Sequence, residues 1–189
     1  MAVIKVVIDA NVLYSGFTRD LLLSLFSAAF YEAKWTDEIN DEWVRHLLEN
    51  RSNINPANVK RTLRLMNSIQ PNPIVADYKH IIEQLSLPDK DDRHVLAAAI
   101  ACGAKKILTW NLKDFPEKFL KEFGILAENP DKFLATLISE DPISVANIFR
   151  SVRIRQNRPP LDIAGFLSAL QVNNLTQTYH QIERYRNYL

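Results

Sequence analysis

Two short apolar runs predict the core strands of an α/β domain with a mostly parallel sheet. Residues 3–8 (VIKVVI) are almost wholly apolar and β-branched, which is typical of a central strand buried on both faces. Residues 106–110 (KILTW) repeat this pattern later in the chain. Weaker strand signals stand at Lys34–Trp35 and at residues 124–127, where an edge element is expected. Helical patterns separate these runs, as they do in sheets whose parallel strands are joined by crossover helices.

Apolar residues at helical spacing predict the helices that flank this sheet. The clearest stripe is formed by Ile39, Trp43 and Leu47, in a helix that begins after Thr36. Gly103 is expected to end a later helix, because glycine readily adopts the left-handed conformation found just past helix ends. The helices of this part of the chain are expected at residues 21–30, from residue 36, from Pro56 and at residues 95–102.

After residue 128 the pattern changes to helices without any strand signal. We therefore predict a first domain over residues 1–128 and an all-helical C-terminal extension over residues 129–189. About sixty residues are few for an independent core, so the extension is expected to pack on the first domain, on a second copy of the chain or on a partner. Its helices are expected at residues 132–139, 142–152, 161–173 and 175–188.

Acidic residues recur where predicted strands end and helices begin. Asp9 follows the first strand directly, and Asp114 comes shortly after the second. Glu42 borders the apolar stripe of its helix, so it can point along the edge of the sheet. A third group, before the helix at 95–102, comprises Asp89, Asp91 and Asp92. Ligands bind at the carboxyl edge of open α/β sheets, and we expect these acids to converge there.

Each of these acids also has an ordinary structural explanation. Aspartates at helix N-termini are usually caps, and Asp114 fits a turn ahead of Phe115. Four acids at one edge would nevertheless repel one another unless cations neutralised them. Oxygen ligands suit Mg²⁺ or Mn²⁺, which keep several waters and bind through few carboxylates. The sequence therefore indicates a site for one of these cations.

Taken in order, these motifs resemble the PIN-domain ribonucleases, and within them the VapC-type toxins. The resemblance runs from about Val3 to Phe115 and implies a PIN-like fold for the first domain. Its motifs are residues 9–11 (DAN), Glu42, residues 89–92 (DKDD) before an alanine-rich helix, and residues 109–115 (TWNLKDF). It implies an acidic quartet that holds the metal and carries catalysis, made of Asp9, Glu42, Asp92 and Asp114. It gives supporting positions to Asn11, Asp91, Thr109 and Asn111.

The resemblance implies a metal-dependent endoribonuclease that hydrolyses RNA phosphodiester bonds. It also implies that the protein is a toxin paired with a small antitoxin protein, and that it forms a homodimer. Two alternatives stay open: a PIN-fold nuclease for structured RNA or DNA in processing or repair, and an inert binding module. An intact quartet argues against the inert module. Within the quartet, Glu38 is an alternative to Glu42, because it lies one helical turn away.

No side-chain nucleophile is needed for this chemistry, and none stands out. Cys102, the one cysteine, lies on an alanine-rich helix and is expected to be a small core residue. His94 stands next to the third acidic motif. It fits a residue that supports the site, a phosphate contact, or an ordinary histidine at the start of a helix.

Composition limits the class of protein. The chain has 189 residues, of which 47% are hydrophobic and 24% charged, as in ordinary globular proteins. Its apolar runs are shorter than the roughly 20 residues that span a bilayer, and its N-terminus lacks the pattern of a signal peptide. We therefore expect a cytoplasmic protein without a membrane segment.

The net charge of +1 does not by itself indicate nucleic-acid binding, so an RNA-binding protein of this charge needs a local basic surface. Residues 150–158 contain four arginines and no acid, and they could contact phosphate. The alternative is a solvated helix end whose cations complement the helix dipole. The candidate nucleic-acid ligands are Arg150, Arg153, Arg155 and Arg158. Other basic positions, among them Lys60, Arg61 and Arg64, are expected to serve solubility.

Overall fold

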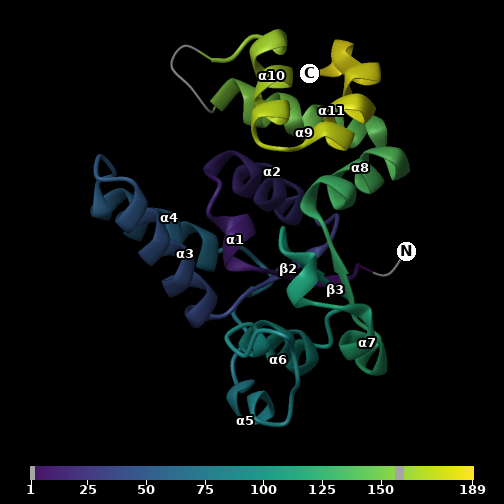
Figure 1. Ribbon diagram of the computed structural model, residues 1–189. Helices are drawn as coiled ribbons and strands as arrows, with labels where there is room; N and C mark the ends of the chain where they lie inside the picture. The colour runs from purple at the N-terminus through teal and green to yellow at the C-terminus, as the bar shows by residue number, and fades with distance from the viewer. Residues whose placement is uncertain (1–2, 156–159) are drawn as a thin grey trace. The chain divides into compact units, whose positions relative to one another are not determined.

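The computed structural model describes residues 3–155 and 160–189 (Figure 1). The chain divides into two compact units. The first comprises Met1–Tyr14 and Tyr31–Glu128, and the second comprises Ser15–Phe30 and Asn129–Leu189. The second unit thus contains the predicted helical extension and, in addition, a segment from the early part of the chain.

A four-stranded sheet forms the centre of the first unit. Its strands are β1 (Lys5–Ile8), β2 (Glu32–Lys34), β3 (Lys106–Leu108) and β4 (Leu126–Glu128). They lie in the order β2-β1-β3-β4, and all neighbours pair in parallel. This confirms the predicted α/β class with a mostly parallel sheet. The elements described after β4 are helical, as was also predicted.

Strand β1 lies inside the sheet, as its apolar sequence predicts. Val6, Val7 and Ile8 are completely buried. Val7 pairs with Lys34 of β2 on one side and with Ile107 of β3 on the other. The next residue, Asp9, donates its backbone N–H to the Leu108 carbonyl at 3.0 Å, so the end of β1 is fixed beside the end of β3.

Capping residues fix the start of α3 and the end of α6 in the first unit. The Thr36 hydroxyl accepts the Ile39 N–H at 3.0 Å and starts α3, whose predicted stripe of Ile39, Trp43 and Leu47 is buried. Gly103 ends α6 in the left-handed conformation, with φ of 68°. Helix α6 packs against β1 and β3. The helices are α1 (Ala10–Leu13), α3 (Asp37–Asn50), α4 (Pro56–Asn67), α5 (Lys79–Ile82), α6 (Arg93–Cys102) and α7 (Glu117–Leu120), with 3₁₀ turns η1 (Leu112–Asp114) and η2 (Lys121–Phe123).

All regular secondary structure among the described residues of the second unit is helical. Its elements are α2 (Gly16–Ser27), α8 (Pro130–Glu140), α9 (Pro142–Arg155), α10 (Ile163–Val172), α11 (Thr176–Ile182) and the 3₁₀ helix η3 (Glu183–Tyr188). Helix α2 packs against α9, and α8 packs against α9 and α11. The rings of Phe17 and Phe149 both contact the ring of Phe166, with centroids 5.6 and 6.1 Å from it. An aromatic cluster therefore joins α2 to the C-terminal helices of the same unit.

The buried carboxylate of Asp131 ties two helices of the second unit together. It accepts the backbone N–H groups of Gln177 and Thr178, each at 2.8 Å, and the Thr178 hydroxyl at 2.8 Å. These N–H groups lie in the first turn of α11, where no intrahelical acceptor exists. Asp131 of α8 thus caps α11 from a distant position in the sequence.

Some elements differ from the sequence prediction. Strand β3 ends at Leu108 rather than at residue 110. The single helix expected over residues 175–188 is α11 followed by η3, with a non-helical Tyr185 inside η3. Helix α1 is one turn long, which is too short for a hydrophobic period to be recognised. In residues 3–155 and 160–189, no helix combines the length and the apolarity needed to cross a membrane.

Candidate active site

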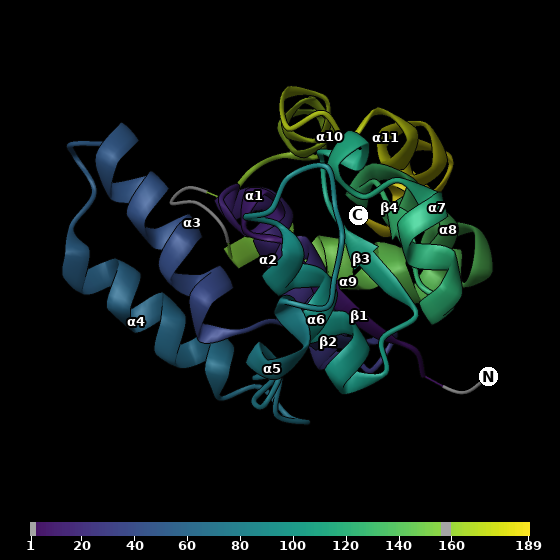
Figure 2. The same ribbon diagram turned by 60° about the horizontal axis from the view of Figure 1, so that its bottom comes forward.

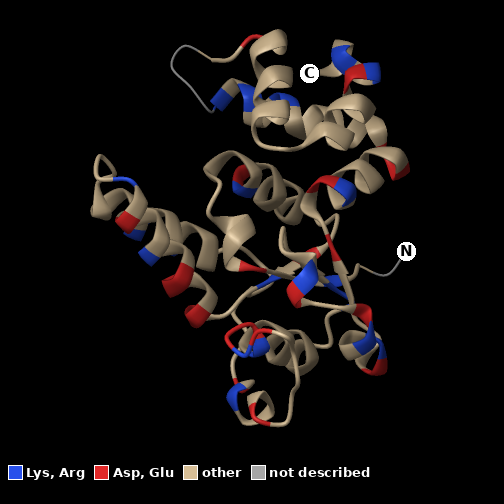
Figure 3. Cartoon of the chain, viewed as in Figure 1, with Lys and Arg blue, Asp and Glu red and all other residues tan. Residues whose placement is uncertain are grey.

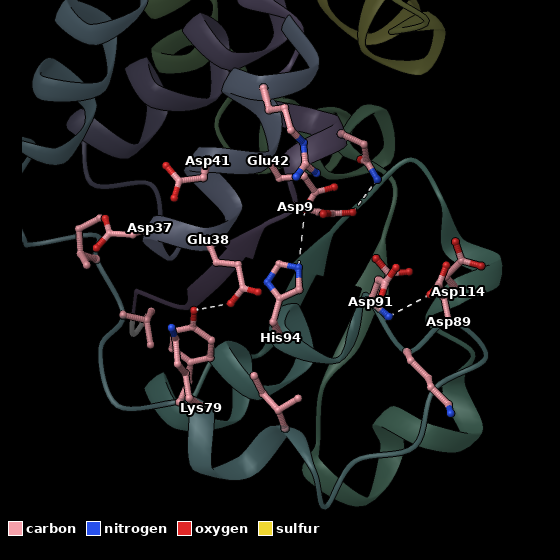
Figure 4. Close-up of a pocket in the computed structure, with 18 of the residues that line it drawn as sticks. Asp9, Asp37, Glu38, Asp41, Glu42, Lys79, Asp89, Asp91, His94 and Asp114 are labelled. Atoms are coloured by element: carbon pink, nitrogen blue, oxygen red, sulfur yellow. Dashed lines mark hydrogen bonds and ion pairs between the residues drawn. The ribbon is translucent and has the colours of Figure 1, made fainter. Parts of the chain in front are cut away.

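An acidic pocket opens at the carboxyl end of the sheet in the first unit (Figure 4). Its cavity measures ≈ 1200 Å³. All four members of the predicted quartet line it, although they come from separate segments of the chain. These are Asp9, Glu42, Asp92 and Asp114. Six further carboxylates line the same pocket: Asp37, Glu38, Asp41, Asp77, Asp89 and Asp91.

Asp9 is the most firmly held of these carboxylates. It follows β1 and is the N-cap of α1, and its Oδ1 accepts the Ala10 N–H at 2.7 Å. Its Oδ2 accepts the Thr109 hydroxyl at 2.7 Å and the Asn11 amide at 2.5 Å. Only 3% of the residue is exposed. Three donors from two loops therefore fix the orientation of this carboxylate.

Thr109 connects the loops that follow β1 and β3. Besides donating to Asp9, its hydroxyl accepts the Asn11 side-chain amide at 2.9 Å and the Asn111 backbone N–H at 3.0 Å. Asn11 in turn accepts the Trp110 N–H at 3.0 Å. The predicted supporting residues Asn11 and Thr109 thus belong to one hydrogen-bond network around Asp9.

Asp114 is placed by the 3₁₀ turn η1. Its backbone N–H donates to the Asn111 carbonyl at 3.1 Å, and the Asn111 amide donates to its Oδ2. Asn111 therefore orients the Asp114 carboxylate, and its supporting role in the site stays a prediction.

Asp92 stands at the N-cap position of α6 but does not cap it. Its side chain makes no capping hydrogen bond, so the carboxylate is not occupied by the helix end. Asp89 instead accepts the Asp91 N–H at 2.9 Å and stabilises the loop before α6. Asp91 is exposed and lines the same pocket. The geometry gives Asp89 a structural explanation and leaves Asp92 facing the pocket.

Burial and mutual repulsion raise the pKa of two quartet members. The pKa of Asp92 rises to about 7, through desolvation and then through the charges of Asp9, Asp114, Asp89 and Glu42. The pKa of Asp9 rises to about 6, mainly through desolvation, with a smaller contribution from Glu42 and against the lowering effect of the Thr109 hydrogen bond. These carboxylates therefore act on one another electrostatically, as members of one cluster.

Glu42 is distinguished from its neighbour Glu38 by its partners. The Tyr78 hydroxyl donates to Glu38 Oε2 at 2.8 Å. Glu42 Oε2 instead lies 3.7 Å from Nε2 of the buried His94 (Figure 4). Glu38 is thus bound to the segment before α5, whereas Glu42 stands beside Asp9 and Asp92 in their electrostatic field. This arrangement favours Glu42 as the second acid.

His94, which the sequence left between a supporting residue and an ordinary helix-start histidine, lines the pocket. Burial lowers its pKa, but contact with Glu42 and the charges of Glu38, Glu42 and Asp9 outweigh this effect, and the net pKa is raised. Its Nδ1 is buried and has no hydrogen-bond partner. Its position two residues after Asp92, on the first turn of α6, is the sequence signal that points to it.

The donor set fits a hard divalent cation. The pocket offers carboxylate oxygens, and two of its acids carry raised pKa values that a bound cation would lower. Among the described residues, no three His, Cys, Asp or Glu side chains are grouped so as to surround one ion. Mg²⁺ does not require such a cage, since it binds through one or two carboxylates and keeps several waters. The residues therefore fit Mg²⁺ or Mn²⁺ held partly through water.

The predicted arginine patch lies in the second unit, where two of its members have structural roles. Arg153 donates to the carbonyls of Leu161 and Leu189. Arg155 pairs with Asp20 at 2.6 Å. Arg150 is exposed on α9, and Arg158 lies outside the described residues. Arg153 and Arg155 thus have partners within the second unit, and the nucleic-acid role of these arginines stays a prediction.

Comparison with known proteins places the chain in a family. The PIN domain model matches residues 5–113, more than half of the chain, and the model of the VapC50 C-terminal domain matches residues 130–184. A relative from Mycobacterium tuberculosis (strain ATCC 25618 / H37Rv), named "Putative ribonuclease VapC50", is 56% identical over 43 residues. That match spans 23% of this chain and 25% of the relative. No solved structure matches the chain. The chain therefore belongs to the PIN-domain family and is of the VapC type.

Proposed function

We propose that this protein is a divalent-metal-dependent endoribonuclease that hydrolyses RNA phosphodiester bonds at the acidic pocket. The observation that carries the proposal is the convergence of Asp9, Glu42, Asp92 and Asp114 at one sheet edge. Helix capping does not account for all four acids, because the Asp92 side chain makes no capping hydrogen bond, and its pKa is raised by burial and then by the neighbouring carboxylates. The ribonuclease named among the relatives supports the same activity.

The proposed chemistry assigns the metal to the quartet. A bound Mg²⁺ or Mn²⁺ would lower the pKa of a water molecule and polarise the phosphoryl oxygen of the substrate. Asp9, locked by Thr109, Asn11 and the Ala10 N–H, supplies the fixed carboxylate of the site. Asp92 and Glu42 supply the less constrained carboxylates.

The substrate is assigned to RNA with exposed bases. Carboxylates line the pocket and repel phosphate, so the RNA backbone has to reach the bound cation directly. An unpaired strand can bring its backbone there more easily than a duplex can. A cytoplasmic location agrees with this substrate. We also propose that the protein is the toxin of a toxin–antitoxin pair and that it forms a homodimer.

Cleavage of total cellular RNA tests the activity. Purified protein with Mg²⁺ or Mn²⁺ is expected to give discrete products that disappear with a chelator and in Asp9→Asn. Asp41→Asn is the matched control, because Asp41 lines the same pocket but lies outside the quartet. Equal cleavage by wild-type protein and Asp9→Asn would refute the proposed site.

Expression in a bacterial host tests the toxin assignment. Wild-type protein is expected to arrest growth, and Asp9→Asn is expected not to do so. Co-expression of a small protein encoded beside the gene should restore growth. Active cleavage without growth arrest would instead favour a nuclease of RNA processing or repair.

A further inference from the structure

A basic stretch of the chain lies between Glu42 and the acidic motif at residues 89–92. Residues 50–76 contain four cations and neither Asp nor Glu, in a chain that otherwise balances 23 basic residues against 22 acidic ones. The four cations are Arg51, Lys60, Arg61 and Arg64. Such segregation leaves a local positive surface in a nearly neutral protein.

Helix α4 carries three of these cations on its exposed face. Val59 and Met66 are buried against the unit, whereas Lys60, Arg61 and Arg64 are exposed. Among the described residues, none of the three forms an ion pair with an acidic side chain. The fourth cation, Arg51, already lies over the Tyr14 ring, 5.5 Å from its centroid. The three cations of α4 therefore remain available to a ligand.

This basic face is connected to the acidic pocket through α3. Helices α3 and α4 lie side by side as an antiparallel hairpin in both ribbon views (Figures 1 and 2). Asn67, the last residue of α4, accepts Trp35 Nε1 at 3.0 Å and the Asn40 amide at 3.4 Å. These bonds fix the end of α4 beside the first turns of α3, which line the pocket.

Helix α3 carries two further basic residues among those that line the pocket, and one of them, His46, lies 3.9 Å from Glu49 of the same helix. Arg45 and His46 are exposed on α3 and line the pocket at its rim. Lys and Arg of this hairpin are blue in Figure 3, and the acids of α3 that line the pocket are red. Charge therefore changes sign along the hairpin, from acidic at the start of α3 to basic on α4.

We propose that Lys60, Arg61 and Arg64 of α4, together with Arg45, bind the sugar–phosphate backbone of the RNA strand beyond the bond that is cleaved. The inference rests on the proposed ribonuclease function. Ten carboxylates but only three Lys and Arg side chains (Arg45, Lys79 and Lys90) line the pocket, so its net charge repels a polyanion except at the cation site. Most of the affinity for a long RNA is therefore expected from cations beyond the acidic lining, and α4, which packs against the pocket-lining helix α3, supplies three of them.

The test compares two triple variants that change the net charge equally. Lys60→Gln/Arg61→Gln/Arg64→Gln removes the α4 cations, and glutamine keeps the helix propensity. The control, Lys105→Gln/Lys118→Gln/Lys121→Gln, removes three exposed lysines elsewhere in the first unit. Binding of a long single-stranded RNA is measured in the Asp9→Asn background, so that cleavage does not interfere. Circular dichroism checks the fold of each variant.

The α4 variant is expected to bind the long RNA about tenfold more weakly, and the slope of log affinity against log salt should fall by about 2, or roughly 0.7 for each lost contact. With active protein, KM is expected to rise for long RNA, and this loss should shrink as the RNA is shortened. The control triple is expected to behave as the parent protein. Unchanged RNA affinity in the α4 variant, or an equal loss in the control, would overturn the proposal.

The two proposals fail in different ways. If wild-type protein cleaves no RNA, the ribonuclease function fails, but the binding experiment still reports on the α4 surface. If wild-type protein cleaves and the α4 variant binds and cleaves long RNA normally, only the surface assignment fails. Loss of binding to an acidic protein, with RNA affinity unchanged, would assign α4 to a protein partner and overturn the RNA proposal.

Discussion

At the scale of single residues, the candidate site combines acids that the sequence predicts with partners that it does not. Asp9 and Asp114 could be placed from the ends of the strands, and Asp92 from the start of its helix. The choice between Glu42 and Glu38 needed Tyr78, whose contact with Glu38 spans 40 positions of the sequence. Such long-range contacts leave no local pattern, which is also why the burial of His94 could not be predicted.

The raised pKa values predict an unusual stability profile for the metal-free protein. Asp9 and Asp92 have folded-state pKa values of about 6 and 7, above the ordinary value of 3.8, so the folded state binds protons more tightly than the unfolded state. The free energy of unfolding should therefore decrease as pH rises from about 4 to about 7 and then level off.

Asp92→Asn removes the larger of these two penalties without removing a helix cap. At pH 8 without metal, the variant is expected to be more stable than wild type by about 1–2 kcal/mol, after allowance for solvent screening of a half-exposed group. Near pH 4 the two should agree. Urea unfolding at both pH values measures the difference, and a variant less stable than wild type at pH 8 would contradict the coupling.

The Thr109 hydroxyl is predicted to support RNA cleavage by holding the Asp9 carboxylate in its orientation. Thr109→Val keeps the shape but removes one donor to Asp9 and one acceptor shared by Asn11 and Asn111. We expect RNA cleavage to fall about 10–100-fold, as for other groups that orient a metal ligand, with a stability loss of about 1–3 kcal/mol. Thr109→Ser should restore most of both. Cleavage kinetics and urea unfolding of the two variants measure these effects. Full activity in the valine variant would show that Thr109 does not support the site.

At the scale of elements, prediction succeeded where a pattern is local and long enough. Strand β1, the stripe of α3 and the Gly103 cap of α6 each follow from a few consecutive residues. Helix α1 and the break between α11 and η3 were not predicted, because capping and tertiary contacts decide such short pieces.

The cap of α11 by Asp131 is such a tertiary contact, and it predicts a large effect on stability. Asp131→Ala would leave the N–H groups of Gln177 and Thr178 and the Thr178 hydroxyl without their acceptor in a buried place. We expect a loss of about 2–4 kcal/mol in the free energy of unfolding. Asp141→Ala, which removes an exposed acceptor of the Ser144 N–H in the same unit, should cost less than about 1 kcal/mol. Equal losses in the two variants would contradict this role of Asp131.

At the scale of the whole molecule, the sequence pattern separates residues 1–128 from the helices that follow. It does not predict that residues 15–30 join the later helices in one compact unit. That grouping depends on the packing of α2 against α9 and on the contact of Phe17 with Phe166, which lie far apart in the sequence.

This grouping predicts that residues 1–128 are not self-sufficient. A chain ending at Glu128 would keep α2 but lose α9, its partner in the second unit. We expect it to aggregate or to unfold at lower urea concentration than the full chain, since an apolar helix face would be exposed. Size-exclusion chromatography and urea unfolding of both chains provide the test. A truncated chain as stable and monodisperse as the full protein would show that α2 does not need these helices.

Asp9, Glu42, Asp92 and Asp114 are proposed to form one site for a divalent cation. The most direct test of this site is a Mn²⁺ titration followed by electron paramagnetic resonance of the free ion, without RNA. Wild type and Asp41→Asn are expected to bind Mn²⁺ alike, whereas Asp9→Asn and Asp92→Asn should each bind it more weakly by about tenfold or more. Unchanged Mn²⁺ affinity in both quartet variants would contradict the account.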